Sequence, residues 1–159
     1  MDEKVKFTED SYEKAVIKLF TELGYEYECG YDLDDRDEEL PYYDGLVLKC
    51  SQRLNPQLGE TGIENLLNTV TWIDGSSMMQ KNETFTDWIQ NGITIEDEVD
   101  GEYRNVTAKI VDYDNIDNND LRIVNQWTVE GTSRKRCDIV VFLNGLPIVD
   151  IELKSPSNK

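Results

Sequence analysis

Apolar residues recur every three or four positions over 9–23, a spacing that is typical of a helix with one buried face. Thr8 precedes this segment as a candidate N-cap, and Gly24 follows it as a terminator. The pattern therefore predicts a first helix. Glu13 falls on the same side of that helix as Phe20, which is a costly place for an unpaired carboxylate.

In the middle of the chain, apolar residues recur at helical spacing in some segments and at strand spacing in others. Helical spacing predicts helices over 62–72 and 83–90, and we expect Trp72 and Trp88 to be core aromatic residues. Strand-like runs predict further extended segments over 25–31, 42–48, 93–99, 103–111 and 121–129, of which 93–99 and 103–111 form a hairpin about Asp100-Gly101.

Near the C-terminus, apolar runs over 139–143 and 148–153 flank the turn dipeptide Asn144-Gly145, a pattern that predicts a β-hairpin. Ionisable residues interrupt these apolar strands: Asp138, Glu152 fourteen positions later, and Lys154. Ionisable groups in apolar strands are costly unless they are paired or bind a cation. The hairpin is therefore the candidate site.

The register of the hairpin decides whether these side chains can meet. A two-residue turn pairs Leu143 with Leu146 and leaves Glu152 and Lys154 on the face opposite to Asp138. A three-residue loop with a bulge at Gly145 shifts the pairing by one residue. One face of a central, doubly covered pair of strands then carries Asp138, Asp150, Glu152 and Lys154.

Two carboxylates on such a face suit Mg²⁺ or Mn²⁺, which bind one or two protein carboxylates together with waters and a substrate phosphate. Lys154 can orient the attacking water or stabilise the charge of the transition state. This combination indicates phosphodiester hydrolysis. Strand-end charges and an ordinary surface ion pair are the alternative interpretation, because this spacing also arises by chance.

The segment 137–156 (CDIVVFLNGLPIVDIELKSP) resembles the nuclease core of the R (motor and restriction) subunit of type I restriction enzymes, in the PD-(D/E)xK nuclease superfamily. Segments 7–27, 82–96 and 117–131 resemble the same N-terminal region in the same order. The resemblance covers essentially the whole chain. It implies an α/β fold with a central mixed β-sheet flanked by helices, and we expect the strands near 103–111, 121–129, 137–143 and 147–154 in that sheet.

The resemblance also implies roles for individual residues. Asp138 and Glu152 correspond to the metal-binding carboxylates of the family, and Lys154 corresponds to its catalytic lysine. Glu13, on the first helix, corresponds to a glutamate that can join the metal site; a partly exposed helix charge is the alternative. Cys137 stands where the superfamily name has proline, a position that carries no chemistry.

By the same resemblance, residues 1–159 form a single endonuclease domain of a longer chain whose helicase-like motor domains lie outside this sequence. ATP then belongs to the full-length protein alone. The implied partners are double-stranded DNA and the modification and specificity subunits of a restriction complex. We expect a cytoplasmic protein without membrane contact, because the sequence has no signal peptide and no apolar run long enough to span a bilayer.

The charge opposes nucleic-acid binding, since 16 basic against 33 acidic residues give a net charge of −17. The acidic run Asp32, Asp34, Asp35, Asp37, Glu38 and Glu39 is interpreted as a solvated loop. The basic run Arg134, Lys135 and Arg136 is a candidate phosphate contact or an ordinary strand-end loop.

Absent residues and motifs narrow the chemistry further. The sequence contains no histidine, which excludes Ser-His-Asp hydrolysis and histidine-based metal nucleases, and it has no phosphate-binding glycine motif. Its three cysteines form no C-x-x-C pair, so reduced thiols are expected. A repair or recombination nuclease of the same fold, and a noncatalytic acidic DNA mimic, are the alternative functions.

Overall fold

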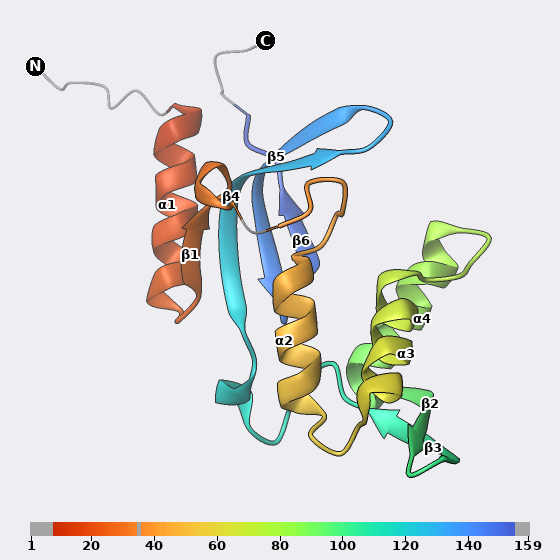
Figure 1. Ribbon diagram of the computed structural model, residues 1–159. Coiled ribbons are helices and arrows are strands. Elements are labelled where there is room, and N and C mark those ends of the chain that lie inside the picture. Colours follow the sequence, from red (N-terminus) through yellow and green to blue (C-terminus); the bar gives the residue numbers. More distant parts are fainter. Residues whose placement is uncertain (1–7, 35, 155–159) are drawn as a thin grey trace, which may run out of the picture. The chain divides into compact units, whose positions relative to one another are not determined.

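The computed structural model describes residues 8–34 and 36–154 (Figure 1). The chain divides into two compact units, which are described separately. The first is formed by the chain up to Pro41, by Leu121–Phe142 and by the chain from Pro147; the second is formed by Tyr42–Asp120 and Leu143–Leu146. No helix in the described ranges is long and apolar enough to cross a membrane.

A mixed four-stranded sheet organises the first unit, in the order β1-β4-β5-β6. Its strands are β1 (Glu26–Cys29), β4 (Leu121–Glu130), β5 (Arg134–Leu143) and β6 (Leu146–Ile151). β1 runs parallel to β4, whereas short turns join β4 to β5 and β5 to β6. The helix α1 (Glu9–Glu22) packs against β1 and β4, as the red helix in Figure 1 shows. The predicted α/β fold with a mixed sheet is confirmed, and it is consistent with a restriction-endonuclease-like core.

α1 begins and ends where the sequence predicts. The Thr8 side chain accepts a hydrogen bond from the Ser11 N–H at 3.2 Å, and the Ser11 hydroxyl in turn accepts one from the Thr8 N–H at 2.8 Å. These reciprocal bonds satisfy backbone donors that have no partner within the helix. Gly24 follows the last turn with a φ of 94°, a conformation that glycine adopts without steric cost.

β5 is the central element of the first unit. Four successive residues, Ile139 to Phe142, are buried, which requires cover on both faces of the strand. The ring of Phe142 lies 4.6 Å from the ring of Trp127 on β4. β6, in contrast, is an edge strand, and Ile148 and Val149 are 38% and 44% exposed. The prediction that both strands of the hairpin are central and covered on both faces is thus confirmed for β5 and wrong for β6.

The expected place of 103–111 in the central sheet is also wrong. β3 (Glu102–Ala108) pairs with β2 (Ile93–Val99) in a separate two-stranded sheet, and β1 is the neighbour of β4 instead. The β2–β3 hairpin about Asp100-Gly101 is confirmed. One side chain of every two in β2 is buried, whereas β3 is exposed over most of its length, so this hairpin has a single covered face.

Three helices complete the second unit: α2 (Asp44–Leu54), α3 (Glu60–Thr71) and α4 (Met78–Asn91). The predicted helices over 62–72 and 83–90 are confirmed as α3 and as part of α4. The extended segment expected over 42–48 is wrong, because α2 begins there. Its buried residues Val47, Cys50 and Leu54 recur at helical spacing, but most of that period lies beyond residue 48.

The hydrophobic core of the second unit lies between these helices and the β2–β3 hairpin. Trp88 packs against it as expected, but Trp72, at the C-cap of α3, is 76% exposed, so its predicted core position is wrong. The buried members of the core are Val47, Leu66, Val70, Ile93, Ile95, Ala108, Ile110 and Leu146.

A carboxylate from β2 caps the start of α3. Asp97 is fully buried, and its oxygens accept hydrogen bonds from the N–H groups of Gly59 and Gly62 at 3.2 and 3.0 Å and from the Arg104 guanidinium at 3.1 Å. A side chain at Gly62 would place a Cβ 2.5 Å from Asp97 Oδ1, so the close approach requires glycine. An anion at a helix N-terminus is favoured by the backbone dipoles.

This arrangement makes stability depend on pH. Burial acts to raise the pKa of Asp97, but the hydrogen bonds from Gly59, Arg104 and Gly62 outweigh it and hold the pKa below the ordinary value of 3.8. A lowered folded-state pKa stabilises the protein above the unfolded-state pKa, and this stabilisation is lost as the pH falls through the folded-state pKa. We expect Asp97→Asn to unfold at a lower temperature than the wild type at neutral pH.

The difference between Asp97→Asn and the wild type shrinks as the pH falls below about 4, the range in which an ordinary aspartate protonates. Thermal unfolding followed by circular dichroism from pH 7 to pH 2.5 measures it. Asp100→Asn, in the exposed β2–β3 turn, is the matched control for the charge change. Equal pH dependence of the two variants contradicts the role of Asp97.

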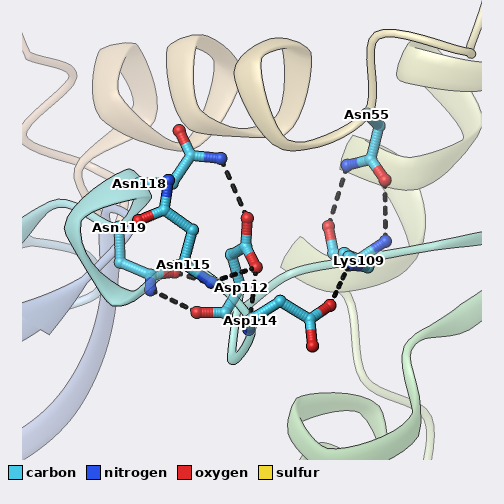
Figure 2. A network of polar contacts seen from close by, with 7 residues as sticks. All are labelled: Asn55, Lys109, Asp112, Asp114, Asn115, Asn118 and Asn119. Atoms are coloured by element: carbon cyan, nitrogen blue, oxygen red, sulfur yellow. Dashed lines mark hydrogen bonds and ion pairs between the residues drawn. The ribbon is translucent and has the colours of Figure 1, made fainter.

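The polar loop 112–120 has an ordered hydrogen-bond network (Figure 2). The Asp112 carboxylate accepts from the N–H groups of Asp114 and Asn115, both at 3.1 Å, and from the Asn118 amide at 3.0 Å. These bonds lower the pKa of Asp112, the Asn118 amide contributing most. The Asn119 amide donates to the Asp112 carbonyl at 2.8 Å, so the acidic and amide side chains of this loop hold its own backbone.

Asn144 ties the hairpin turn to this loop. It is 3% exposed, and its amide nitrogen donates to the Ile110 carbonyl at 2.9 Å and to Asn119 Oδ1 at 3.0 Å. Its amide oxygen accepts from the Asp120 N–H at 2.7 Å. A Cβ on the following residue, Gly145, would come within 2.6 Å of the Val47 N–H nitrogen, so the second turn position is closed to other residues.

Substitutions at Asn144 separate the hydrogen bonds from the backbone conformation. Asn144→Ala loses three hydrogen bonds and forces alanine into a left-handed conformation, and we expect a loss of about 2–4 kcal/mol in the free energy of unfolding. Asn144→Gly loses the same bonds without that strain and retains about 1 kcal/mol more stability. Urea unfolding measures both values. Equal stability of the two variants contradicts a left-handed Asn144.

Candidate active site

The hairpin has a two-residue turn. β5 ends at Leu143, β6 begins at Leu146, and the two residues between them have positive φ angles, 51° for Asn144 and 82° for Gly145. Positive φ at both positions is the type I′ geometry, which matches the twist of paired strands and favours Asn-Gly. The structure therefore adopts the first of the two registers considered for this hairpin.

This register separates two of the carboxylates. Asp138 and Asp150 lie on opposite faces of the strand pair, and the 3.3 Å ion pair between Lys135 Nζ and Asp150 Oδ2 agrees with that arrangement. The bulged register, in which Asp138, Asp150, Glu152 and Lys154 share a face, is wrong. Its bulge is unnecessary, because asparagine tolerates the left-handed conformation that the tighter turn requires.

Asp138 is nevertheless joined to the segment that carries the other two site residues. β6 ends at Ile151, and the next residues leave the ladder. The Leu153 N–H donates a hydrogen bond to Asp138 Oδ2 at 2.8 Å. The structure therefore brings the Asp138 carboxylate to the backbone between Glu152 and Lys154, where strand alternation no longer dictates side-chain direction.

Glu152 and Lys154 are at the surface. Their side chains are 49% and 85% exposed, and Lys154 Nζ lies 4.0 Å from Glu152 Oε2, at the limit of an ion pair. Such an exposed pair contributes little to stability. Both groups are accessible to a ligand that approaches from solvent.

Glu13 contacts β4. Its Oε1 accepts from the Asn125 amide at 2.5 Å, and its Oε2 accepts from the Gln126 amide at 2.9 Å. Throughout residues 8–34 and 36–154, no three His, Cys, Asp or Glu side chains are grouped so that they could hold a metal ion. The structure thus brings Glu13 to two amides of β4 and does not gather it with Asp138 and Glu152 into one such group.

The three residues of the basic run have different partners. Arg134 Nε lies 3.5 Å from Glu130 Oε1, and Lys135 pairs with Asp150. Arg136 instead donates to the hydroxyl of Tyr31 at 3.1 Å, in the short 3₁₀ helix η1 (Gly30–Asp32).

Comparison with known proteins places this site in context. The family described as type I restriction enzyme R protein N terminus matches the chain over residues 6–159. The chain belongs to this family.

Two relatives of this R protein N terminus are similar over nearly its whole length. A Methanocaldococcus jannaschii protein assigned as the type I restriction enzyme MjaIXP endonuclease subunit is 32% identical over 98% of the chain. The type I restriction enzyme HindI endonuclease subunit of Haemophilus influenzae is 29% identical over 93% of it. The chain spans 16% and 15% of the lengths of these relatives.

Sequence reasoning missed the polar groups that surround Glu13 in this R protein N terminus. Gln126 has a φ of 54° in the middle of β4, which breaks strand alternation and lets Asn125 and Gln126 both reach Glu13. Gly30 passes so close that a Cβ there would lie 2.5 Å from the Gln126 carbonyl oxygen. The sequence did contain one signal for this arrangement, the successive amide residues Asn125 and Gln126 inside an otherwise apolar strand.

The acidic loop is largely a solvated segment, as expected. Its described carboxylates, at positions 32, 34, 37, 38 and 39, are exposed, and Asp35 lies outside the described residues. Arg36 is the exception in this loop, because its guanidinium lies 3.8 Å from the centroid of the Trp127 ring and donates to the Thr128 carbonyl. The loop is thereby anchored to β4.

Proposed function

We propose that this chain is the nuclease domain of a type I restriction enzyme R subunit and that it hydrolyses phosphodiester bonds of double-stranded DNA with Mg²⁺ or Mn²⁺. The observation that carries the proposal is the hydrogen bond from the Leu153 N–H to Asp138, which holds the backbone between Glu152 and Lys154 against the Asp138 carboxylate. Membership of the R protein family supports the nuclease assignment.

The donor set fits a hard divalent cation. Magnesium binds proteins through one or two carboxylates and completes its shell with waters and substrate phosphate, so Asp138 and Glu152 suffice as protein ligands. Asp138 keeps one carboxylate oxygen beyond the one that binds Leu153, and Glu152 is half exposed. Glu13 is proposed as a further ligand only if its bonds to β4 open. When bound, the cation polarises the phosphate and lowers the pKa of a bound water.

The protein side chains supply orientation and charge. Lys154 presents an exposed ammonium next to Glu152, where it can orient the attacking water or stabilise negative charge on the phosphate in the transition state. The hydrogen bond from Leu153 keeps the Asp138 carboxylate directed toward this segment. Arg134, Lys135 and Arg136 precede Asp138 on β5 and are proposed to contact DNA phosphates.

The remainder of the activity belongs to the rest of the enzyme. We propose that motor domains in the full-length R subunit bind ATP and translocate unmodified DNA, and that modification and specificity subunits complete the complex. With a net charge of −17, this domain gains little DNA affinity from counterion release. Its partners in the complex must therefore supply most of the affinity for DNA.

Substitutions in the complete enzyme test the site. Asp138→Ala, Glu152→Ala and Lys154→Ala are each expected to lower the DNA cleavage rate by about a hundredfold or more, a cost typical of losing one transition-state contact. ATP hydrolysis and translocation remain, because the ATP-binding residues lie elsewhere. Gel assays of plasmid cleavage, run beside a phosphate-release assay, measure both activities.

Asp150→Ala is the matched control for these substitutions. It removes a carboxylate from the same hairpin, but from the face opposite to Asp138, and it is expected to cleave at close to the wild-type rate. A wild-type cleavage rate in Asp138→Ala contradicts the assignment of the site. Equal loss of cleavage and ATP hydrolysis in that variant shows a structural role instead.

A second prediction concerns residues 1–159 as an isolated protein. Its negative charge repels DNA phosphates, and no motor delivers the substrate, so we expect little binding or cleavage of linear DNA even with Mg²⁺ at low salt. Gel-shift and nicking assays measure this. Tight binding or rapid cutting by the isolated domain contradicts the proposal that other parts of the enzyme supply most of the affinity for DNA.

A further inference from the structure

A continuous chain of hydrogen bonds runs from a cation to an anion across the first unit. Arg136 Nη1 donates to the Tyr31 hydroxyl oxygen at 3.1 Å, the Tyr31 hydroxyl donates to Gln126 Oε1 at 3.3 Å, and Gln126 Nε2 donates to Glu13 Oε2 at 2.9 Å. The four residues come from β5, η1, β4 and α1. Four different segments of this unit therefore contribute to one network.

The bonding capacities of these groups give the chain one direction. A guanidinium only donates and a carboxylate only accepts, so the two ends of the chain are not interchangeable. The Tyr31 hydroxyl has a single hydrogen, which goes to Gln126, and its lone pairs remain for Arg136. Each group in the chain thus orients the next.

The backbone of Gln126 is strained at this point. Its left-handed φ of 54° is an uncommon and unfavourable conformation for glutamine. This conformation directs both amides at Glu13, and it persists only where Gly30 leaves room for the Gln126 carbonyl. Backbone strain of this kind is more frequent at functional sites than elsewhere, and so are irregularities in strands.

Arg136 keeps its positive charge available. Arg134 and Lys135 each have a carboxylate partner, whereas Arg136 makes no ion pair within the described part of the chain and is held by a neutral hydroxyl. Strand alternation puts Arg136 on the same face of β5 as Asp138, about 7 Å along the strand. An oriented guanidinium therefore accompanies the proposed metal ligand.

We propose that Tyr31, Gln126 and Glu13 position Arg136 to bind a phosphate of the DNA strand that is cleaved at Asp138. The inference rests on the proposed function and adds to it a positioning network. A planar guanidinium recognises phosphate oxygens in a directional way, so its orientation affects binding in the transition state. Tyr31 and Gln126 act through Arg136 and do not touch the DNA.

The test uses the complete restriction enzyme and the single-turnover rate of DNA cleavage. Tyr31→Phe removes one hydroxyl and keeps the ring, and we expect cleavage to slow about tenfold, the scale of a lost hydrogen bond to a charged group. Arg136→Ala slows it by about a hundredfold. ATP hydrolysis is unchanged in both variants.

Tyr27→Phe is the matched control. The Tyr27 hydroxyl donates to Asn125 Oδ1 at 3.1 Å, and Asn125 also donates to Glu13, so Tyr27 lies at the end of the network farthest from Arg136. The same chemical change on the same network is therefore expected to leave cleavage at the wild-type rate. A tenfold loss in Tyr27→Phe equal to that in Tyr31→Phe overturns the inference.

A double-mutant cycle separates positioning from a structural contribution. In the Arg136→Ala background, Tyr31→Phe has no further effect on cleavage if Tyr31 acts through Arg136. Additive losses overturn the inference. Gln126→Gly provides a second check, because glycine relieves the strained backbone: the unfolding temperature holds or rises while cleavage slows about tenfold. Wild-type cleavage in Gln126→Gly overturns the inference as well.

Asp138→Ala distinguishes this inference from the proposed function. If Asp138→Ala cleaves at the wild-type rate, the proposed function fails. If Asp138→Ala is inactive while Tyr31→Phe and Arg136→Ala cleave normally, the nuclease assignment stands and the positioning network alone fails.

Discussion

The left-handed turn at Asn144-Gly145 is the constraint on which the candidate site depends. Both residues have positive φ, which forces a two-residue turn and sets the pairing of β5 with β6. That pairing separates Asp138 from Asp150, and beyond the end of β6 at Ile151 the Leu153 N–H reaches the Asp138 carboxylate. The turn itself is held from outside the hairpin, by hydrogen bonds from Asn144 to the loop that follows β3. One asparagine thus fixes the conformation of the turn through these hydrogen bonds.

Irregular backbone, more than regular strand, places polar groups in the first unit. The left-handed Gln126 directs two amides of β4 toward Glu13, which a regular strand cannot do because its successive side chains point to opposite faces. Gly30 permits the close approach. A carboxylate on the apolar side of a helix is costly when unpaired, and these amides satisfy it.

Charge is distributed so that a strongly acidic domain can still present a cation at the site. Most basic side chains in the hairpin are neutralised by nearby carboxylates, as in the pairs Arg134 with Glu130 and Lys135 with Asp150. Arg136 is held by a hydroxyl and retains its charge. Local arrangement, and not net charge, therefore decides where an anionic substrate can be bound.

Local patterns in the sequence determined the elements whose signals are contained within a few residues: α1 with its cap at Thr8 and its stop at Gly24, the hairpin at Asn144-Gly145, and the acidic and basic residues along it. The tertiary structure alone decided which distant segments meet. β1 lies beside β4 where 103–111 was expected, and the segment from Asp44 is helical. Parallel pairing, the partners of Glu13 and the exposure of a side chain depend on contacts between residues far apart in the chain, and periodicity carries no information about such contacts.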